Sequence, residues 1–455
     1  MTISDTLARF VCTLDVAALP EAVTTKAVLH ILDTVGVALL GHTEPSAGLV
    51  LAMAADWGGE PQATVWGGGR RLPASSAALC NGTLSHAYDY DDTHGPAVAH
   101  ISACAVPAAM AAAEMRGSPG RALIAGVVAG YEVGSRIGLA APHVFNQRGF
   151  HGTAIFGTFA AAAAAARVMG LTPEQTANAF GLCGSLASGS LQFIRETASS
   201  AKRLHPGWAA HAGLVAADLA CRGFDGPREV FEGKLGLFNS HIQDGRYDLG
   251  VLTDGLGRQW ETLRISYKPY PACHILHATI DICVDLYREG VRVDEIDAVT
   301  AYIDEHNLDK LVEPRSLKNR PPNPHAARFS LPYCVAVALT RGTAGAPDFA
   351  PDALKDEAVL ALAERVECRV DPDTEFPRTF PGRLTVRLRS GETITRHYRN
   401  GRGSPDWPLT REEVEAKFLA NAAGVLGRDR SAALKGAILN LATEQDVRAL
   451  GKLLA

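Results

Sequence analysis

The sequence predicts a mostly α-helical protein that carries a smaller α/β domain toward its C-terminal end. Long alanine-rich apolar segments run from residue 7 to about residue 263 with few β-branched alternations, a pattern typical of helices. Between about residues 264 and 399, strand and helix patterns occur together. With 455 residues, the chain also exceeds the size at which one hydrophobic core usually stops growing, so we expect two domains.

The helical pattern resumes at Thr410, after the mixed region. We therefore expect a helical domain whose first part is residues 1–263 and whose C-terminal part is residues 400–455. The α/β domain, residues 264–399, is expected to be inserted between these two parts.

Two helix starts carry clear capping signals. Thr172-Pro173-Glu174-Gln175 supplies a capping hydroxyl, a first-turn proline and a capping-box glutamine, and Thr410 with Glu413 repeats the scheme. The most apolar stretch, residues 155–169, is mainly alanine and falls short of the ~18 apolar residues that span a membrane. We interpret it as a tightly packed internal helix and expect no membrane partner.

Apolar alternation marks the elements of the α/β domain. Pro269 and Pro271 precede an apolar helix at about residues 273–287. Residues 296–303 predict a strand because they alternate and are rich in β-branched side chains. Residues 384–398 predict a hairpin, in which Ser390-Gly391 turns the chain between two alternating segments.

Composition argues against several classes of function. The formal net charge of −5 comes without a basic stripe or a block of like charge, so nucleic acid and anionic lipid are not expected partners. The start MTISDTLARF has an early acid and no apolar run, which predicts a cytoplasmic protein. The nine cysteines are widely and irregularly spaced without a CxxC pair, which indicates reduced thiols rather than a metal cluster.

Polar side chains gather most densely at residues 86–100, which hold three aspartates and three histidines. Carboxylates and imidazoles suit a divalent cation. However, the His-x-x-x-His spacing of zinc sites and the glycine and distal glutamate of a calcium loop are absent, so we favour acid–base or substrate-orienting use over a metal. The alternative is that the aspartates cap helix ends or pair with cations at the surface.

His151 lies between an aromatic residue and a glycine, directly ahead of the alanine-rich helix. The positive end of that helix favours a neutral imidazole, which is the form that acts as a base near pH 7. A structural histidine in the core explains the same spacing equally well.

Two further segments place lysines beside hydrogen-bonding partners. They are Lys202-Arg203-Leu204-His205 and Lys268-Pro269-Tyr270-Pro271, the latter followed by His274 and His277. Together they could hold an anionic substrate, because Lys268 falls at the predicted domain junction, where clefts form. Each lysine alone is also compatible with a solvated surface charge.

The order and spacing of these motifs resemble the MmgE/PrpD family. The resemblance spans nearly the whole chain and rests on His86-x-x-Asp89-Tyr90-Asp91-Asp92-Thr93 with a following His100, Gly149-Phe150-His151-Gly152-Thr153, Lys202-Arg203-Leu204-His205-x-Gly207, Lys268-Pro269-Tyr270-Pro271-x-Cys273-x-x-x-His277, Phe329-Ser330-Leu331-x-Tyr333, and Pro408-Leu409-Thr410 with Lys417-Phe418.

This resemblance implies a large all-helical domain formed by both ends of the chain, a smaller α/β lid domain and a homodimer. It also implies an active site between the domains that uses no cofactor and no metal. Relatives of this kind include 2-methylcitrate dehydratase, cis-aconitate decarboxylase and iminodisuccinate epimerase. Their shared step moves a proton on or off a carbon next to a carboxylate, so the expected substrate is a small di- or tricarboxylate.

Matched position by position, the resemblance also implies roles for individual residues. His151 and Lys268 would form the leading acid–base pair, with Asp89 and His100 as further catalytic groups. The expected substrate-binding residues are Lys202, Thr93, Arg203, His205, His274 and His277.

Three departures from the family pattern bear on the substrate. One extra residue precedes His100, and Ile101 stands in the usual proline position. His274 stands where many relatives carry arginine, and an imidazole is a poor substitute for a bidentate carboxylate clamp. The longer sequence specific to the dehydratases is absent around the first motif. The substrate is therefore expected to carry fewer carboxylates or to present them differently.

Three hypotheses for the function follow. The first is a lyase that removes water or carbon dioxide from a polycarboxylate, and the second is an isomerase that epimerises an imino-diacid after the same proton abstraction. The third is a non-catalytic protein that binds carboxylates. Retention of Asp89, His151, Lys202 and Lys268 argues against the third, since a decayed cleft does not need such groups.

Overall fold

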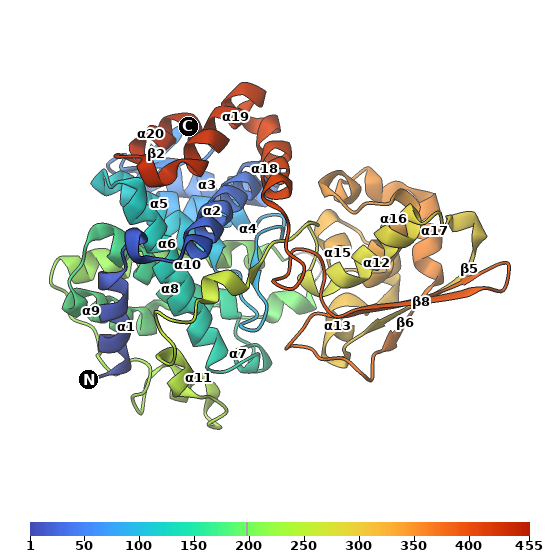
Figure 1. The fold of residues 1–455 in the computed structure, drawn as a ribbon, viewed down its shortest axis with the longest axis horizontal. Coiled ribbons are helices and arrows are strands. Elements are labelled where there is room, and N and C mark those ends of the chain that lie inside the picture. Colours follow the sequence, from blue (N-terminus) through green and yellow to red (C-terminus); the bar gives the residue numbers. More distant parts are fainter. Residues whose placement is uncertain (197–198) are drawn as a thin grey trace.

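The computed structural model describes residues 1–196 and 199–455 and confirms a mostly helical protein with a small mixed sheet in its C-terminal part (Figure 1). Its buried apolar side chains form two cores. The larger core uses residues between 7 and 267 and again between 414 and 454, whereas the smaller one uses residues between 270 and 386. Figure 1 shows the last helices of the chain lying on the helical domain, beside α2.

The helices around the larger core come from both ends of the chain. They are α1 (Ile3–Thr13), α2 (Glu21–Gly41), α3 (Pro45–Asp56), α4 (Ala74–His86), α5 (Ser102–Arg116), α6 (Gly120–Leu139), α7 (Val144–Gln147), α8 (Gly152–Met169), α9 (Pro173–Leu186), α10 (Ala201–Cys221), α11 (Leu237–Ile242), α18 (Arg411–Leu426), α19 (Arg428–Leu439) and α20 (Arg448–Leu454). The capping boxes predicted at Thr172 and Thr410 are present and begin α9 and α18.

Small residues let the central helices approach closely. A Cβ atom added at Gly157 of α8 would lie 2.3 Å from Cys104 Sγ on α5, and one added at Gly82 of α4 would lie 2.7 Å from the Cα atom of Gly207 on α10. The alanines of α8 are all buried. This confirms the predicted internal helix and fixes α4, α8 and α10, the three helices that carry site residues, against one another.

Among the described residues, three helices are long and apolar enough to cross a membrane by length and composition: α2, α6 and α8. Within the protein, 67% of the apolar window of α2 and 89% of those of α6 and α8 are buried. With 18 residues, α8 is longer than the apolar stretch expected at residues 155–169, because Gly152, Thr153 and Ala154 join its first turn. Packing against other helices accounts for the apolar character of all three.

The smaller core is built from helices and a four-stranded sheet. The helices are α12 (His277–Arg288), α13 (Leu308–Leu311), α14 (Arg315–Asn319), α15 (Pro324–Arg328), α16 (Leu331–Arg341) and α17 (Glu357–Arg365), and the strands are β5 (Ile296–Ile303), β6 (Val366–Val370), β7 (Gly382–Leu388) and β8 (Thr393–Tyr398). The strand order is β6-β5-β7-β8, with β5 and β6 parallel and the other pairs antiparallel.

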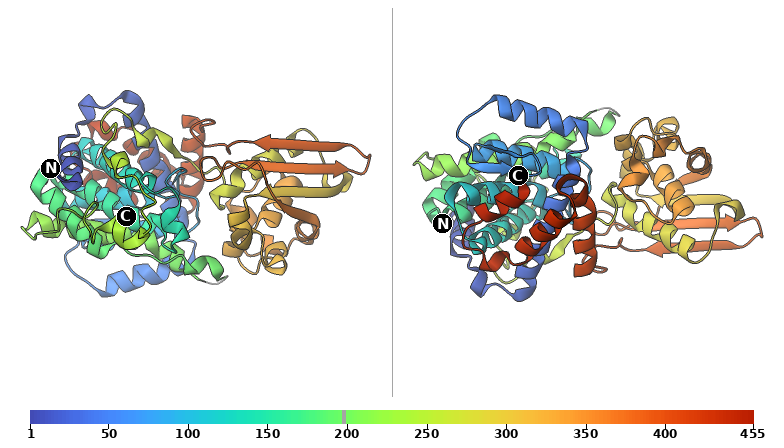
Figure 2. Two further views of the ribbon diagram at one scale, coloured as in Figure 1. Left: turned by 90° about the horizontal axis from the view of Figure 1, so that it is seen from below. Right: turned by 90° about the horizontal axis from the view of Figure 1, so that it is seen from above.

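Register explains why this sheet has one buried face. Val299 pairs with Val386 and Ala301 with Leu384, and all four side chains belong to the smaller core. The views in Figure 2 show the hairpin of β7 and β8 extending away from the helical domain. The predicted strand at 296–303 and the predicted hairpin are thus confirmed.

Two predictions for local structure need correction. The apolar helix begins at His277 rather than at residue 273, because a 3-10 turn at His274–Leu276 precedes it. The part expected to be helical also contains short strands, namely β1 (Ala63–Val65), β2 (Arg70–Leu72) and β3 (Thr93–His94). A further strand, β4 (Ile265–Ser266), lies just after the predicted boundary at residue 263, yet Ile265 packs in the larger core. These strands have only two or three residues each, too few for alternation to reveal them in the sequence.

The pairing of β3 with β4 brings two distant polar segments together. Thr93 lies opposite Ser266 and His94 lies opposite Ile265. This register sets the loop that follows α4 beside the segment that leads from the helical domain into Lys268, and it therefore positions the site described next.

Candidate active site

The four polar segments singled out in the sequence, around Asp89, His151, Lys202 and Lys268, contribute side chains to one pocket between the two cores. The pocket has a volume of about 70 Å³. Its polar lining comes from the loop after α4, the start of α8, the start of α10 and the segment before α12. The lining residues are Asp89, Thr93, Val98, His100, Asn146, His151, Leu191, Phe193, Ile194, Lys202, Lys268, Cys273, His274, Ile275, Lys310, Phe329 and Phe380.

Asp89 lies at the centre of the charged groups. Its Oδ1 atom is 2.7 Å from Lys268 Nζ and 2.9 Å from Lys202 Nζ, and Lys268 Nζ also donates to the Asp89 carbonyl oxygen at 2.8 Å. Burial alone would raise the pKa of Asp89, but the two ammonium groups hold it well below its usual range. The pocket therefore contains one ionised carboxylate between two lysines.

The backbone at Asp89 is unusual and serves this arrangement. Its φ of 53° lies in the left-handed region, which aspartate tolerates better than most residues. In this conformation both the carboxylate and the carbonyl oxygen of Asp89 accept from Lys268. A single loop residue thus provides two acceptors for one buried ammonium group.

His100 is held in a defined tautomer. Its Nδ1 atom lies 2.8 Å from the carbonyl oxygen of Asp92, and since a carbonyl oxygen only accepts, Nδ1 carries the proton. Burial lowers the pKa of His100 well below its usual value, so the ring is neutral and Nε2 has a free electron pair. That Nε2 atom lies 3.8 Å from Asp89 Oδ1.

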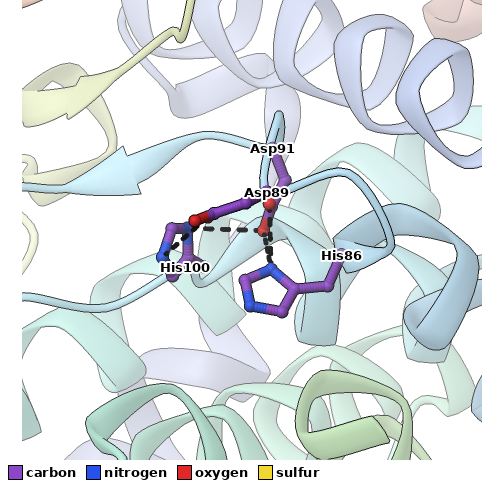
Figure 3. A group of neighbouring side chains, drawn as sticks. All are labelled: His86, Asp89, Asp91 and His100. Carbon is purple, nitrogen blue, oxygen red and sulfur yellow. Dashed lines mark hydrogen bonds and ion pairs between the residues drawn. The ribbon is translucent and has the colours of Figure 1, made fainter. Parts of the chain in front are cut away.

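His86 and Asp91 form a second buried pair beside Asp89 and His100 (Figure 3). His86 Nδ1 lies 2.8 Å from Asp91 Oδ2, and the His86 and His100 rings meet edge to face at 4.7 Å. Burial lowers the pKa of His86 well below normal and raises that of Asp91. Through the contact between the two rings, this buried pair helps to hold His100 in position.

His151 occupies the N-cap position of α8, as its place in the sequence predicted, but its side chain makes no capping hydrogen bond. Its Nδ1 atom lies 2.9 Å from Nδ1 of His205, so one of the two rings donates to the other. Burial is the largest cause that lowers the pKa of His151 well below normal, and electrostatic interactions with His205 and Lys202 act in the same direction. The neutral imidazole expected from the helix dipole is therefore supported, although burial is the larger cause.

Lys202 faces both Asp89 and an aromatic ring of the smaller domain. Its Nζ atom lies 5.2 Å from the centre of the Phe329 ring, and Lys310 Nζ lies 5.6 Å from the same ring. Burial lowers the pKa of Lys202. Phe329 and Lys310 both line the pocket, so the smaller domain contributes an aromatic side chain and a third cation.

A second layer of buried polar groups holds the loop at residues 89–93. Asp92 Oδ2 lies 2.7 Å from His30 Nδ1 and accepts from Ser102 Oγ. Lys417 of α18 donates to the carbonyl oxygen of Tyr90 at 2.9 Å and pairs with Asp33 at 2.8 Å. No local pattern in the sequence indicated these contacts, because their partners lie on three helices far apart in the chain.

The acidic loop also has the composition of a metal site. His86, Asp89, Asp91 and His100 offer ligand atoms within 4.8 Å of one another. However, Asp89 already binds two ammonium groups and His86 Nδ1 is engaged with Asp91. Two lysine charges at this distance would repel a divalent cation, so the donor set fits an anion-binding site better than a metal site.

Three of the predicted substrate-binding residues do not line the pocket. His205 lies behind His151, and His277 lies against His274, where its Nε2 atom donates to the carbonyl oxygen of Ala272 at 3.1 Å. Arg203 lines a separate cavity and donates to the Ala87 carbonyl oxygen. Thr93 and His274 do line the pocket, and burial lowers the pKa of His274 to about 3.

Several lining residues were not predicted as site residues. Phe329 belongs to a motif that indicated the family but no role, whereas Lys310, Phe193 and Phe380 lie in segments without a recognisable motif. Only the folding of the smaller domain against the helical one brings Phe329, Lys310 and Phe380 to the pocket, whereas Phe193 comes from the helical domain and lies against His151. A lone lysine such as Lys310 carries no sequence signal that separates it from a surface charge.

Fold and pocket together define a class: a two-domain, mostly helical protein with a buried, lysine-rich pocket suited to a small organic anion. The family model of the MmgE/PrpD N-terminal domain matches residues 5–249, and that of the MmgE/PrpD C-terminal domain matches residues 270–443. The chain belongs to the MmgE/PrpD family.

Curated relatives extend over nearly the entire chain. The cis-aconitate decarboxylase of Homo sapiens is 29% identical, with 100% of this chain and 94% of that protein covered. A cis-aconitate decarboxylase-like protein of Aspergillus oryzae is 27% identical, with 98% and 95% covered. The cis-aconitate decarboxylase of Aspergillus terreus is 26% identical, with 96% and 92% covered.

Proposed function

We propose that this protein is a cofactor-independent lyase that removes carbon dioxide from a small polycarboxylate such as cis-aconitate. The observation that carries the proposal is the pair of buried lysines, Lys202 and Lys268, that share Asp89 in a pocket also lined by the neutral imidazoles of His100 and His151. The similarity to cis-aconitate decarboxylases supports the same reaction class.

Charge explains how such a pocket would take a polyanion. Two ammonium groups face one ionised carboxylate, and the third cation, Lys310, lies at the lid side. Substrate carboxylates would bind at Lys202 and Lys268, with Thr93 orienting the substrate and Asp89 orienting the two lysine side chains. The surrounding aromatic rings exclude water, which strengthens these interactions.

The reaction follows from these positions. When the C–C bond to the departing carboxylate breaks, carbon dioxide leaves and the electron pair stays on the substrate, where it spreads onto a neighbouring carboxylate. Lys202 stabilises that enediolate-like charge. Lys268, as the ammonium acid, delivers the proton that replaces the lost carboxylate, and neutral His151 completes the acid–base pair.

A second candidate reaction is epimerisation of an imino-diacid. It is favoured by the presence of two kinds of proton carrier, a lysine ammonium and neutral imidazoles, around one small pocket. Epimerisation needs two groups on opposite faces of one carbon, whereas decarboxylation needs only one proton donor.

The resemblance to the family also leads us to propose a homodimer, which light scattering of the purified protein tests.

Turnover of di- and tricarboxylates in deuterated water, followed by NMR, tests the proposal. We expect cis-aconitate to lose carbon dioxide and its product to gain one deuterium at carbon. Exchange of a substrate proton for deuterium without net conversion would instead support the epimerase, and loss of water would support a dehydratase. Absence of both conversion and exchange across the panel contradicts enzymatic action on this class.

Replacement of Lys268 by methionine tests its role in the reaction. We expect Lys268→Met to lower kcat by about 10²-fold or more, because general acid catalysis contributes at that level. Lys435→Met is the matched control, since Lys435 pairs with Glu415 on the far helices α18 and α19. Unchanged turnover in Lys268→Met would remove this lysine from the mechanism.

A further inference from the structure

We propose that a second cavity, beside the catalytic pocket, binds a small oxyanion that bridges the two domains. The cavity has a volume of about 440 Å³, and its lining shares no residue with that of the catalytic pocket. Glu44, Tyr88 and Arg203 line it from the helical domain, and His325 and Arg328 line it from the smaller domain.

Arg328 is buried with an unpaired donor. Its side chain is only 2% exposed, and its buried Nε atom has no hydrogen-bond partner among the described residues. It lies 4.0 Å above the Tyr88 ring, and its nearest carboxylate, Glu44, is 3.9 Å away. A guanidinium has five N–H donors, and a buried donor without an acceptor is costly. An oxyanion in the cavity would supply that acceptor.

The cavity also carries an excess of positive charge. Arg203, also buried, lies 3.5 Å from the same Glu44 carboxylate, so one acid faces two guanidinium groups. Arg203 already donates to Ala87, Ser46 and Ser200, whereas the Nε atom of Arg328 lacks such a partner among the described residues. The fork of an arginine side chain matches a planar carboxylate or a phosphate.

His325 adds a neutral polar group to this lining. Burial, together with the nearby cations Arg203 and Lys202, lowers the pKa of His325 to about 3. A neutral imidazole can donate one hydrogen bond to an oxyanion without adding charge. The ligand chemistry is therefore that of a small anion with several acceptor oxygens.

Adjacency along the chain connects this cavity to the catalytic pocket. Arg203 follows Lys202 on α10, and Phe329 follows Arg328 at the end of α15. Lys202 and Phe329 line the catalytic pocket, whereas their neighbours line the second cavity. An anion held by both arginines would therefore fix Lys202 relative to the lid domain. We expect occupancy to change KM for the substrate of the catalytic pocket.

Calorimetric titration of the full-length protein tests the site, with inorganic phosphate and malonate as separate probes. We expect saturable binding of at least one probe, weakened about tenfold or more in Arg328→Met because a charge-assisted hydrogen bond is lost. The probe that binds more tightly shows whether the site prefers a phosphate or a carboxylate. Binding should survive in Lys268→Met, whose substitution lies in the catalytic pocket.

A second variant, for which we expect tighter binding, distinguishes a change in the site from misfolding of the protein. Glu44→Gln removes the carboxylate that faces both arginines and should tighten binding of the same probe severalfold, a gain that a damaged protein cannot produce. The proposal is overturned if neither probe binds the wild-type protein, if Arg328→Met binds as well as wild type, or if Glu44→Gln binds no more tightly. Binding lost in Lys268→Met but kept in Arg328→Met would assign the anion to the catalytic pocket instead. None of these outcomes depends on turnover.

Discussion

Asp89 is the carboxylate that balances the charges of both buried lysines in the site. It is the shared partner of two buried lysines, and its left-handed backbone lets its carbonyl oxygen contribute as well. Without its charge, Lys202 and Lys268 would face each other in a buried pocket with no ionised partner at hydrogen-bonding distance among the described residues. Repulsion between them would then oppose folding and would change how substrate carboxylates bind.

Asp89→Asn tests this dependence, since asparagine keeps the size of the side chain and tolerates the same backbone conformation. We expect unfolding in urea to show a loss of about 3–5 kcal/mol, the typical result of breaking a buried ion pair. Turnover should fall as well. Asp352→Asn, which alters an exposed surface pair with Lys355, serves as the control and should leave the urea midpoint unchanged. An unaltered midpoint in Asp89→Asn would contradict the central role of its charge.

At the scale of elements, the site depends on how closely α4 and α10 pack. Gly82 of α4 faces Gly207 of α10, and a Cβ atom at Gly82 would also lie 2.9 Å from the carbonyl oxygen of Ala103 on α5. Both obstacles are backbone atoms, which cannot move aside as a flexible side chain can. The absence of side chains at this crossing therefore sets the position of Lys202 relative to the loop that holds Asp89.

Gly82→Ala should separate these helices. We expect a loss of stability of about 1–3 kcal/mol from overpacking, together with a rise in KM as Lys202 shifts. Gly436→Ala on α19 is the matched control, because a Cβ atom there meets nothing within 4 Å. Its expected effect is a gain of about 0.4–1 kcal/mol, since alanine restricts the unfolded chain. Chemical denaturation of both variants measures the difference, and equal midpoints would refute close packing as the cause.

At the scale of the whole molecule, burial of histidines makes folding sensitive to pH. Burial lowers the pKa of His205 from 6.5 to about 4, so between these values the unfolded chain binds a proton that the folded protein does not. The stability that His205 contributes is therefore present above pH 6.5 and is lost as the pH falls toward 4. Buried carboxyls such as Asp281, whose pKa burial raises to about 6, act in the opposite direction.

Comparison of the wild-type protein with His205→Gln isolates this contribution from the opposing ones. As the pH falls from 6.5 to 4, the wild-type protein should lose up to about 3 kcal/mol more unfolding free energy than the variant does. His397→Gln, at an exposed position of β8, controls for the substitution by glutamine. Urea denaturation at several pH values measures the slopes, and parallel slopes for wild type and His205→Gln would disprove the linkage.

The sequence by itself determined most of the secondary structure and the class of the fold. Local side-chain chemistry determines the capping boxes at Thr172 and Thr410, and periodicity determines the strand at 296–303 and the hairpin at 384–398. Both kinds of signal depend only on residues that are neighbours in the sequence. The motifs around Asp89, His151, Lys202 and Lys268 likewise indicated the family, since their order and spacing can be followed directly along the chain.

Only the tertiary structure decided which of these residues share one pocket and what surrounds them. Lys310 and Phe329 reach the pocket because the smaller domain packs against the helical one, and Lys417 supports Tyr90 across 327 residues of chain. It also assigned Arg203 to a cavity of its own, where the Nε atom of Arg328 lacks a hydrogen-bond partner among the described residues. Contacts between distant segments depend on the burial and packing of the whole chain, so no local pattern can encode them.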